Sequence, residues 1–349
     1  MTSFYPGPSK MHPLLGEFLQ KTYESGILSN NHRSKQFENL YQETSKNLKN
    51  WLSIPENYEL LFFSSATECW QVLTQHPFGE ERLHIFNGAF GQKWAEVSEN
   101  LTNQKVEKIQ FDIQNFPEIN YKENIDFVAL TQCETSNGTF LPNQIIAQIR
   151  DNYPKAVIAV DATSAMAGIN TQWENADIWF ASLQKCFGLP SGLAVMFIKS
   201  DLAKSISENK AKDSCYNSLS NSIINQQKWQ TTHTPNILGI HLLNQLAQTK
   251  LPNFELLEKS MQNWIHFFEQ NNHFQSLIKN SQTQSPTVIA ATASEDAVSK
   301  IKYLTEKQEL IIGNGYGEWK KNSIRIANFP VHTHEEKLQL MEILKHFQN

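Results

Sequence analysis

Short apolar blocks alternate with longer amphipathic stretches through the first two thirds of the chain. Amphipathic helices are expected over residues 34–52 and 145–153, where apolar positions recur with helical spacing. The apolar blocks predict strands over 59–64, 82–86, 106–111, 125–131, 156–160, 178–181 and 193–198. This alternation is typical of an α/β fold with a mostly parallel sheet covered by helices.

The pattern changes after about Thr234. Helices are expected there over 237–246, 254–270 and 334–347, with strands over 287–291 and 323–327. We therefore predict a large domain of residues 13–235. A smaller C-terminal α+β domain would span 236–349, together with the N-terminal segment 1–12.

Composition narrows the function classes. The 349 residues carry 30 basic and 35 acidic side chains, a formal net charge of −5, and no basic block that would follow a nucleic acid or an anionic membrane. Apolar runs fall short of the ~20 residues of a spanning helix, and the start MTSFYPGPSK lacks a secretion signal. We expect a cytoplasmic protein without nucleic-acid or membrane partners. No C-x-x-C pair or three-ligand set indicates a metal site.

Two charged side chains follow successive predicted strands. Asp161 ends the block Val157–Asp161, and Lys185 follows the next block within a Ser-Leu-Gln-Lys run. Ligands of parallel sheets collect at the carboxyl ends of strands. A lysine there could form an imine with pyridoxal phosphate while an acid keeps the pyridine nitrogen protonated. The alternative is that both residues lie in ordinary loops.

Three further segments fit such a cofactor. Ser64–Glu68 offers backbone N–H groups and hydroxyls for a phosphate, or only a helix cap. Phe90 could cover a flat ring, or belong to the core. Thr135 could face the hydroxyl edge of the ring, or lie in a turn.

Together these segments resemble a known family. Asp161, Ser-Leu-Gln-Lys185, Glu-Thr135-Ser-Asn-Gly and Ser-Ile-Arg325-Ile-Ala-Asn-Phe are similar to the class V branch of fold-type I pyridoxal-phosphate aminotransferases. The opening Phe-Tyr-Pro-Gly-Pro-Ser and the Asn-His32-Arg-Ser step are similar to the phosphoserine aminotransferases of that branch. The resemblance spans nearly the whole chain.

The resemblance implies a role for each matching residue. Lys185 would carry the cofactor and move protons, and Asp161 would pair with the ring nitrogen. The other cofactor-binding residues would be Phe90 on the ring, Thr135 and Gln184 at the ring hydroxyl and phosphate, Ala66 and Thr67 in the phosphate turn, and His233 and Thr234 from a second subunit. Substrate would be bound by His32, Arg33 and Arg325, and the protein would be a homodimer with shared active sites.

The substrate is less well specified. The resemblance favours transfer of an amino group from glutamate to 3-phosphohydroxypyruvate, a step of serine biosynthesis. However, the His-Arg pair that commonly precedes the carboxylate-binding arginine is replaced here by Gly-Glu318-Trp-Lys320-Lys321-Asn. The two lysines could supply part of that positive charge, although Glu318 opposes them.

Three alternatives stay open to different degrees. A small-acid class V transaminase of the serine–pyruvate or alanine–glyoxylate type fits the cofactor residues equally well. A cysteine desulfurase needs a thiol late in the chain, and no cysteine follows Cys215. A non-catalytic binding protein of the same fold would have no need for Lys185 opposite Asp161.

Overall fold

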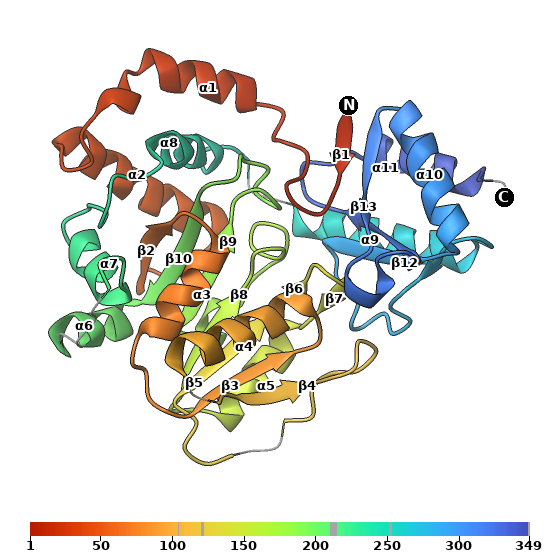
Figure 1. Cartoon of the computed structure of the whole chain (residues 1–349). Helices are drawn as coiled ribbons and strands as arrows, with labels where there is room; N and C mark the ends of the chain where they lie inside the picture. The colour runs from red at the N-terminus through yellow and green to blue at the C-terminus, as the bar shows by residue number, and fades with distance from the viewer. Residues whose placement is uncertain (104, 120–121, 210–214, 251–252, 348–349) are drawn as a thin grey trace.

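The computed structural model describes residues 1–103, 105–119, 122–209, 215–250 and 253–347. Figure 1 shows a large sheet with helices on both faces and a smaller sheet beside it that carries both chain ends. Among the described residues, no helix is both long and apolar enough to cross a membrane.

The larger sheet is mostly parallel, as the sequence predicts. Its strands lie in the order β2 (Tyr58–Phe63), β10 (Ala194–Lys199), β9 (Ile178–Ser182), β8 (Val157–Asp161), β5 (Phe127–Thr131), β3 (Arg82–Phe86) and β4 (Glu107–Gln110). Strand β10 runs antiparallel to both β2 and β9. The neighbours from β9 to β4 pair in parallel. Their carboxyl ends therefore meet along one edge, which is where ligands bind in such sheets.

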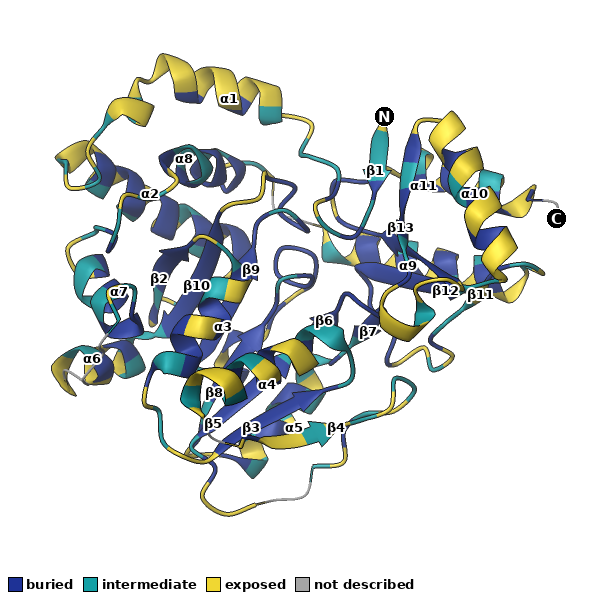
Figure 2. Ribbon diagram, in the orientation of Figure 1, coloured by how far each residue is buried: buried dark blue, intermediate teal, exposed yellow. Residues whose placement is uncertain are grey.

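Both faces of this sheet are buried. Leu60 and Phe62 of β2 pack into one hydrophobic cluster, whereas Leu61 and Phe63 pack into another, as the two-residue period of a strand requires. The first cluster includes α2 (Lys35–Leu52), α5 (Asn143–Asn152) and α8 (Ile237–Leu246); the second includes α3 (Ala66–Gln75), α4 (Ala89–Thr102), α6 (Ser200–Asn209) and α7 (Leu219–Gln226). Burial on both sides explains why the strands are continuous apolar blocks. In Figure 2 the central strands of this sheet are dark, the edge strand β4 is largely exposed, and the outer helix faces are yellow.

The smaller sheet has the order β1 (Thr2–Phe4), β13 (Leu310–Asn314), β14 (Ser323–Ala327), β12 (Val288–Thr292) and β11 (Gln275–Ser276). Strand β1 pairs in parallel with β13, and the other neighbours are antiparallel. Its core includes side chains of α9 (Phe254–Glu269), α10 (Glu295–Lys307) and α11 (His334–Lys345). The remaining elements are α1 (Leu15–Glu24), β6 (Cys133–Glu134), β7 (Thr139–Phe140) and the 3₁₀ turns η1 (Ile27–Ser29), η2 (Trp173–Asn175) and η3 (Gly317–Trp319).

The domain boundary at residues 235 and 236 stays a prediction. Helix α8 lies just after it, yet Ile237 and Ile240 of α8 belong to the hydrophobic cluster of the large sheet. Asn244 of the same helix accepts a hydrogen bond from Asn47 of α2 at 2.8 Å. The first helix after the predicted boundary therefore packs with the large body of the molecule.

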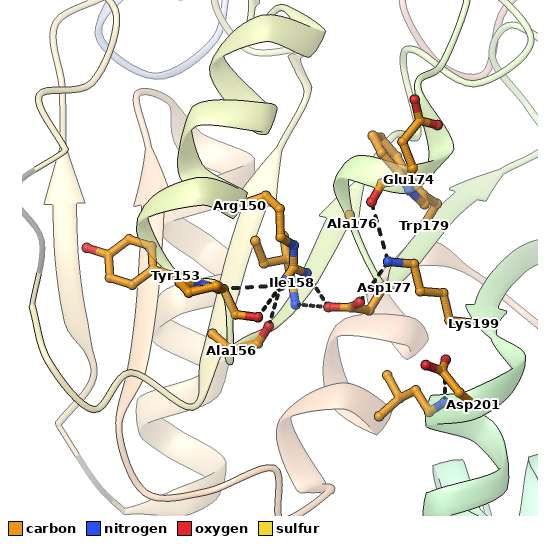
Figure 3. A network of polar contacts seen from close by, with 12 residues as sticks. Arg150, Tyr153, Ala156, Ile158, Glu174, Ala176, Asp177, Trp179, Lys199 and Asp201 are labelled. Carbon is orange, nitrogen blue, oxygen red and sulfur yellow. Dashed lines mark hydrogen bonds and ion pairs between the residues drawn. The ribbon is translucent and has the colours of Figure 1, made fainter.

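An ion-pair network ties β9 to its neighbours near the start of that strand. Figure 3 shows Asp177 between Arg150 of α5 and Lys199 at the end of β10. Lys199 Nζ lies 3.1 Å from Asp177 Oδ1, and the Ile158 N–H donates to Asp177 Oδ2 at 2.9 Å. One carboxylate thus connects a helix and three adjacent strands, at the opposite end of β9 from Ser182.

Candidate functional site

Lys185 is a buried lysine held by two hydroxyl groups. Only 7% of the residue is exposed. Its Nζ donates to Thr135 Oγ1 at 2.9 Å and to Ser164 Oγ at 3.1 Å. The pKa of Lys185 is lowered to about 8, mainly by burial and in smaller part by nearby Arg325, whereas Asp161 acts in the opposite direction. The amine is therefore poised to lose its proton far more readily than an exposed lysine.

The N-terminal segment closes over this lysine. Gly7 has a φ of +141°, and a Cβ added there would lie 3.0 Å from Lys185 Cε. The Ser9 N–H donates to the carbonyl of Gln184 at 3.2 Å. A Cβ at position 7 would press against the lysine side chain, and the positive φ of this residue favours glycine.

Asp161 is the last residue of β8 and is 4% exposed. Its Oδ2 accepts from Trp70 Nε1 at 2.8 Å, and its Oδ1 accepts from the Thr163 N–H at 2.9 Å. Burial raises the pKa of Asp161, while these donors and Lys185 pull it back down. The carboxyl group is thus fixed in orientation and lacks the solvation that would stabilise its charge.

Phe90 lies at the start of α4, where its backbone is held by the buried side chain of Glu134 in β6. Glu134 accepts from the N–H groups of Phe90 at 3.2 Å and Gly91 at 3.1 Å, which stabilises a carboxylate at a helix N-terminus. Burial raises the pKa of Glu134, although these bonds and those from Ser136 lower it. The Phe90 ring centroid lies 5.5 Å from Lys185 Nζ.

The start of α3 forms another wall. Ser65 caps the helix by accepting from the Glu68 N–H at 3.1 Å, and the Ala66 N–H donates to Ser182 Oγ at 2.7 Å. Helix α3 begins where β2 ends, so its N-terminus points toward the same edge as the other strand ends.

These groups enclose one cavity of about 120 Å³. The predicted site residues that line it are Ala66, Thr67, Phe90, Thr135, Asp161, Gln184 and Lys185. A larger hollow of about 660 Å³ lies along β4 but contains neither Lys185 nor Asp161, so size alone does not locate the candidate site.

Arg325 of β14 is buried next to this cavity rather than in its lining. Its Nε donates to the Asn314 carbonyl at 2.7 Å and one terminal nitrogen donates to the Thr135 carbonyl at 2.8 Å. The guanidinium carbon lies 5.3 Å from the Tyr316 ring centroid. No carboxylate pairs with Arg325 among the described residues. Its remaining N–H groups can therefore bind an anion.

The other four predicted residues lie elsewhere in this chain. His32 Nδ1 and Thr234 Oγ1 are 3.4 Å apart, and Arg33 donates to Gln230 Oε1 at 2.8 Å. Burial lowers the pKa of His32, with further contributions from Arg33 and His233. His32, Arg33, His233 and Thr234 therefore form one cluster, but none of them lines the cavity.

Several residues of the site were not predicted. Trp70 donates its indole N–H to Asp161, and no spacing in the sequence singles out this tryptophan. Ser164 lies three residues beyond Asp161, so the strand-end rule could have included it. Tyr316 packs between Arg325 and Phe90, whose ring centroid is 5.5 Å away, and no spacing in the sequence marks it.

Fold and strand-end site together define an aminotransferase-like class of protein. The model of the aminotransferase class-V family matches residues 8–315, and the chain belongs to this family. Its fold is that of the class V aminotransferases, which confirms the predicted fold class.

Individual relatives agree with this assignment. A phosphoserine aminotransferase of Rhodococcus opacus (strain B4) is 28% identical over 246 residues, which cover 68% of this chain and 64% of that protein's length. The crystal structure of a phosphoserine aminotransferase from Cytophaga hutchinsonii is 30% identical, covers 99% of this chain and 98% of its own, and has a TM-score of 0.91. An alanine–glyoxylate aminotransferase from Nostoc sp. has a TM-score of 0.80 at 18% identity, covering 98% and 94% of the two chains, and so shares the fold.

Proposed function

We propose that this protein is a pyridoxal-phosphate-dependent aminotransferase, and specifically a phosphoserine aminotransferase. One observation carries the proposal: Lys185 and Asp161 line the same small buried cavity at the carboxyl ends of adjacent parallel strands. A lysine and an acid that only carry surface charge would lie in solvent and would not share a buried cavity. Burying both charged groups is costly unless their chemistry is used.

The donors around the cavity fit the proposed cofactor. Thr131 Oγ1 is buried in the lining and lacks a hydrogen-bond partner among the described residues, so a polar ligand would satisfy it. The start of α3, with Ala66 and Thr67, suits a phosphate group. Phe90 offers an apolar face for a ring, and Asp161 offers a carboxylate for a protonated ring nitrogen.

When bound, pyridoxal phosphate supplies an electron-accepting ring that stabilises negative charge at the substrate's α-carbon. Lys185 Nζ would hold the cofactor and, once freed by the amino substrate, take a proton from that carbon. Its pKa of about 8 lets the neutral amine act as a base near neutral pH. Thr135 and Ser164 orient the amine, because each accepts one of its N–H bonds.

Arg325 would bind the substrate's α-carboxylate. Two of the five N–H groups of its guanidinium are used by backbone carbonyls, which fixes the plane of the group and leaves the other donors for a carboxylate. Tyr316 covers the guanidinium and supports that orientation.

The serine–pyruvate or alanine–glyoxylate type of transaminase is the second candidate, and one observation favours it. Lys320 and Lys321 line a separate hollow beside Lys302 and Glu306, outside the cavity of Lys185. In this arrangement they do not replace the missing His-Arg pair, so the source of positive charge for a substrate phosphate has to be another group.

A homodimer would provide that charge. His32, Arg33, His233 and Thr234 form a surface cluster that serves no purpose in the cavity of their own chain. We place this cluster in the active site of a second subunit, with His233 and Thr234 at the cofactor phosphate and His32 and Arg33 at the distal acidic group of the substrate. The assembly would work in the cytoplasm, in serine biosynthesis.

The test compares amino acceptors on the cofactor-loaded protein. The loaded enzyme is converted with glutamate, and the return of the starting absorbance is timed with 3-phosphohydroxypyruvate, pyruvate or glyoxylate. Preference for 3-phosphohydroxypyruvate supports the proposal, whereas preference for pyruvate or glyoxylate supports the second candidate. Lys185→Ala should abolish exchange, and the exposed Lys204→Ala should not; normal turnover by Lys185→Ala would exclude both.

A further inference from the structure

A second cleft lies far from the chemistry described above, between the N-terminal halves of α9 and α11. It encloses about 450 Å³. Its lining includes Lys259 and Ser260 of α9, Pro330, and His334 and Lys337 of α11. Among the described residues of this lining there is no acidic side chain. The described lining therefore offers ammonium, hydroxyl and amide donors.

Lys337 is the unusual group in this cleft. It is only 7% exposed, and no hydrogen bond or ion pair joins its Nζ to any residue that the structure describes. Most of the side chain is packed away from solvent, but Nζ is not among the fully buried unpaired atoms, so the ammonium group is open to the cleft that Lys337 lines. Burial lowers the pKa of Lys337 to about 8, and Glu336 is the one group that opposes this effect.

The nearest acid is already occupied. Glu336 Oε1 lies 2.6 Å from Lys10 Nζ and accepts from Thr2 Oγ1 at 3.2 Å. Glu336 Oε2 accepts from Lys10 at 2.7 Å and from the Thr333 N–H at 2.9 Å, which completes the cap of α11. Both oxygens of Glu336 thus bind Lys10 and the helix cap, and Glu336 acts on Lys337 only through space, without a direct ion pair.

His332 does not neutralise it either. This residue is 4% exposed and its two ring nitrogens lie beside carbonyl oxygens, 3.3 Å from Phe329 O and 2.9 Å from Ser3 O. The nearby Lys337 contributes to lowering the pKa of His332, after burial itself. His332 is thus satisfied by backbone carbonyls, and Lys337 has no ion pair with the described residues that line the cleft.

We infer that the α9–α11 cleft binds a small oxyanion, either a phosphate group or a carboxylate, with the unpaired ammonium group of Lys337 as its counter-ion. Ser260, which now donates to Asn328 Oδ1 at 2.8 Å, and the exposed Lys259 lie at the same cleft and add donors for such a ligand. The volume accommodates a small metabolite that carries the oxyanion, not only a bare ion. The site goes beyond the proposed transaminase function and does not depend on it.

The first experiment is a calorimetric titration of the cofactor-loaded protein with sodium sulfate at pH 7 and constant ionic strength. The wild-type protein should bind sulfate saturably. Lys337→Met should weaken this binding about tenfold or more, since a charge-assisted hydrogen bond is lost. Lys345→Met is the matched control, because it removes the same charge from an exposed position on the same helix. Equal affinity in the two variants, or no saturable binding by the wild type, would overturn the inference.

A second measurement needs no variant and holds even if Lys337→Met fails to fold. Sulfate is fully ionised at pH 8 and takes up no proton itself. Any proton taken up when sulfate binds is therefore bound by the protein. Titrations in two buffers of different ionisation enthalpy should reveal fractional proton uptake, because an anion raises the lowered pKa of Lys337. Absence of uptake at pH 8 would contradict the assignment. Replacing sulfate by inorganic phosphate and then by acetate separates a phosphate from a carboxylate ligand by relative affinity.

Discussion

Removing the hydrogen bond from Trp70 to Asp161 should lower the free energy of unfolding by an amount that grows with pH. A matched substitution at another buried tryptophan should not show this pH dependence. Trp70→Phe keeps an aromatic ring against Trp94, whose ring centroid is 6.2 Å away, but removes the N–H that donates to Asp161 Oδ2. A hydrogen bond to a charged group contributes about 1.5–3 kcal/mol. Because this bond favours the charged form, the pKa of Asp161, already raised by burial, should rise further in the variant.

The sign of the effect follows from proton binding. A carboxyl group with a raised pKa in the folded state binds more protons than in the unfolded state, so the free energy of unfolding falls as the pH rises through that interval. The extra cost of Trp70→Phe should be small at acidic pH, where Asp161 is protonated in the folded state of both proteins, and should reach about 1.5–3 kcal/mol once the pH exceeds both folded-state pKa values.

Trp94→Phe is the control for this prediction. Trp94 is also buried, but its indole Nε1 has no hydrogen-bond partner among the described residues. Urea denaturation of the cofactor-free variants from pH 4 to 8 gives the difference in free energy of unfolding between them. That difference should grow with pH. A difference that stays constant across this range would refute the role of Trp70 at Asp161.

Three further predictions address other parts of the structure. Gly7→Ala should weaken retention of the cofactor, because the new Cβ meets Lys185 and the positive φ costs about 1–3 kcal/mol. Gly26→Ala is the control, since position 26 also has a positive φ but nothing within 4 Å of the added Cβ. Equal cofactor retention in the two variants would argue against the contact between position 7 and Lys185. Asp177→Asn should lower the free energy of unfolding by about 1–3 kcal/mol, because Arg150 and Lys199 lose their shared carboxylate, and urea denaturation beside the exposed Asp201→Asn checks this. The rate at which the cofactor-free protein takes up pyridoxal phosphate should rise with pH and level off above about pH 8, because the pKa of Lys185 is lowered to that value; a rise that continues to pH 10 would indicate an ordinary, solvated lysine.

The parallel sheet and the strand-end residues were predictable because both depend on local sequence. Buried strands are continuous apolar blocks, and Asp161 and Lys185 follow two of them, so the rule for ligands at strand ends identified both. The predicted strand over 82–86 and helix over 237–246 have the bounds that the structure gives them.

Elements that depend on distant partners were missed. Strand β1 has only three residues and exists because it pairs with β13, more than three hundred residues later in the sequence. β13 is itself a short apolar run between α10 and a glycine-containing turn, and its identity as a strand depends on pairing with β1 and β14. Local periodicity carries no information about such pairings.

The missed site residues have a similar explanation. Trp70 reaches Asp161 across 91 positions of sequence, and Tyr316 meets Arg325 and Phe90 only after the two sheets come together. Each is an aromatic residue whose default role is core packing. The roles of His32, Arg33, His233 and Thr234 stay predictions, because they concern a second subunit.

The central claim is that Lys185 holds pyridoxal phosphate, and one measurement tests it directly. The purified protein, loaded with pyridoxal phosphate, is reduced with borohydride, digested and examined by mass spectrometry. The account predicts that the cofactor's mass is found on the peptide containing Lys185 and that the protein's near-visible absorbance band disappears on reduction. Attachment at another lysine, or a protein that takes up no cofactor, would contradict it.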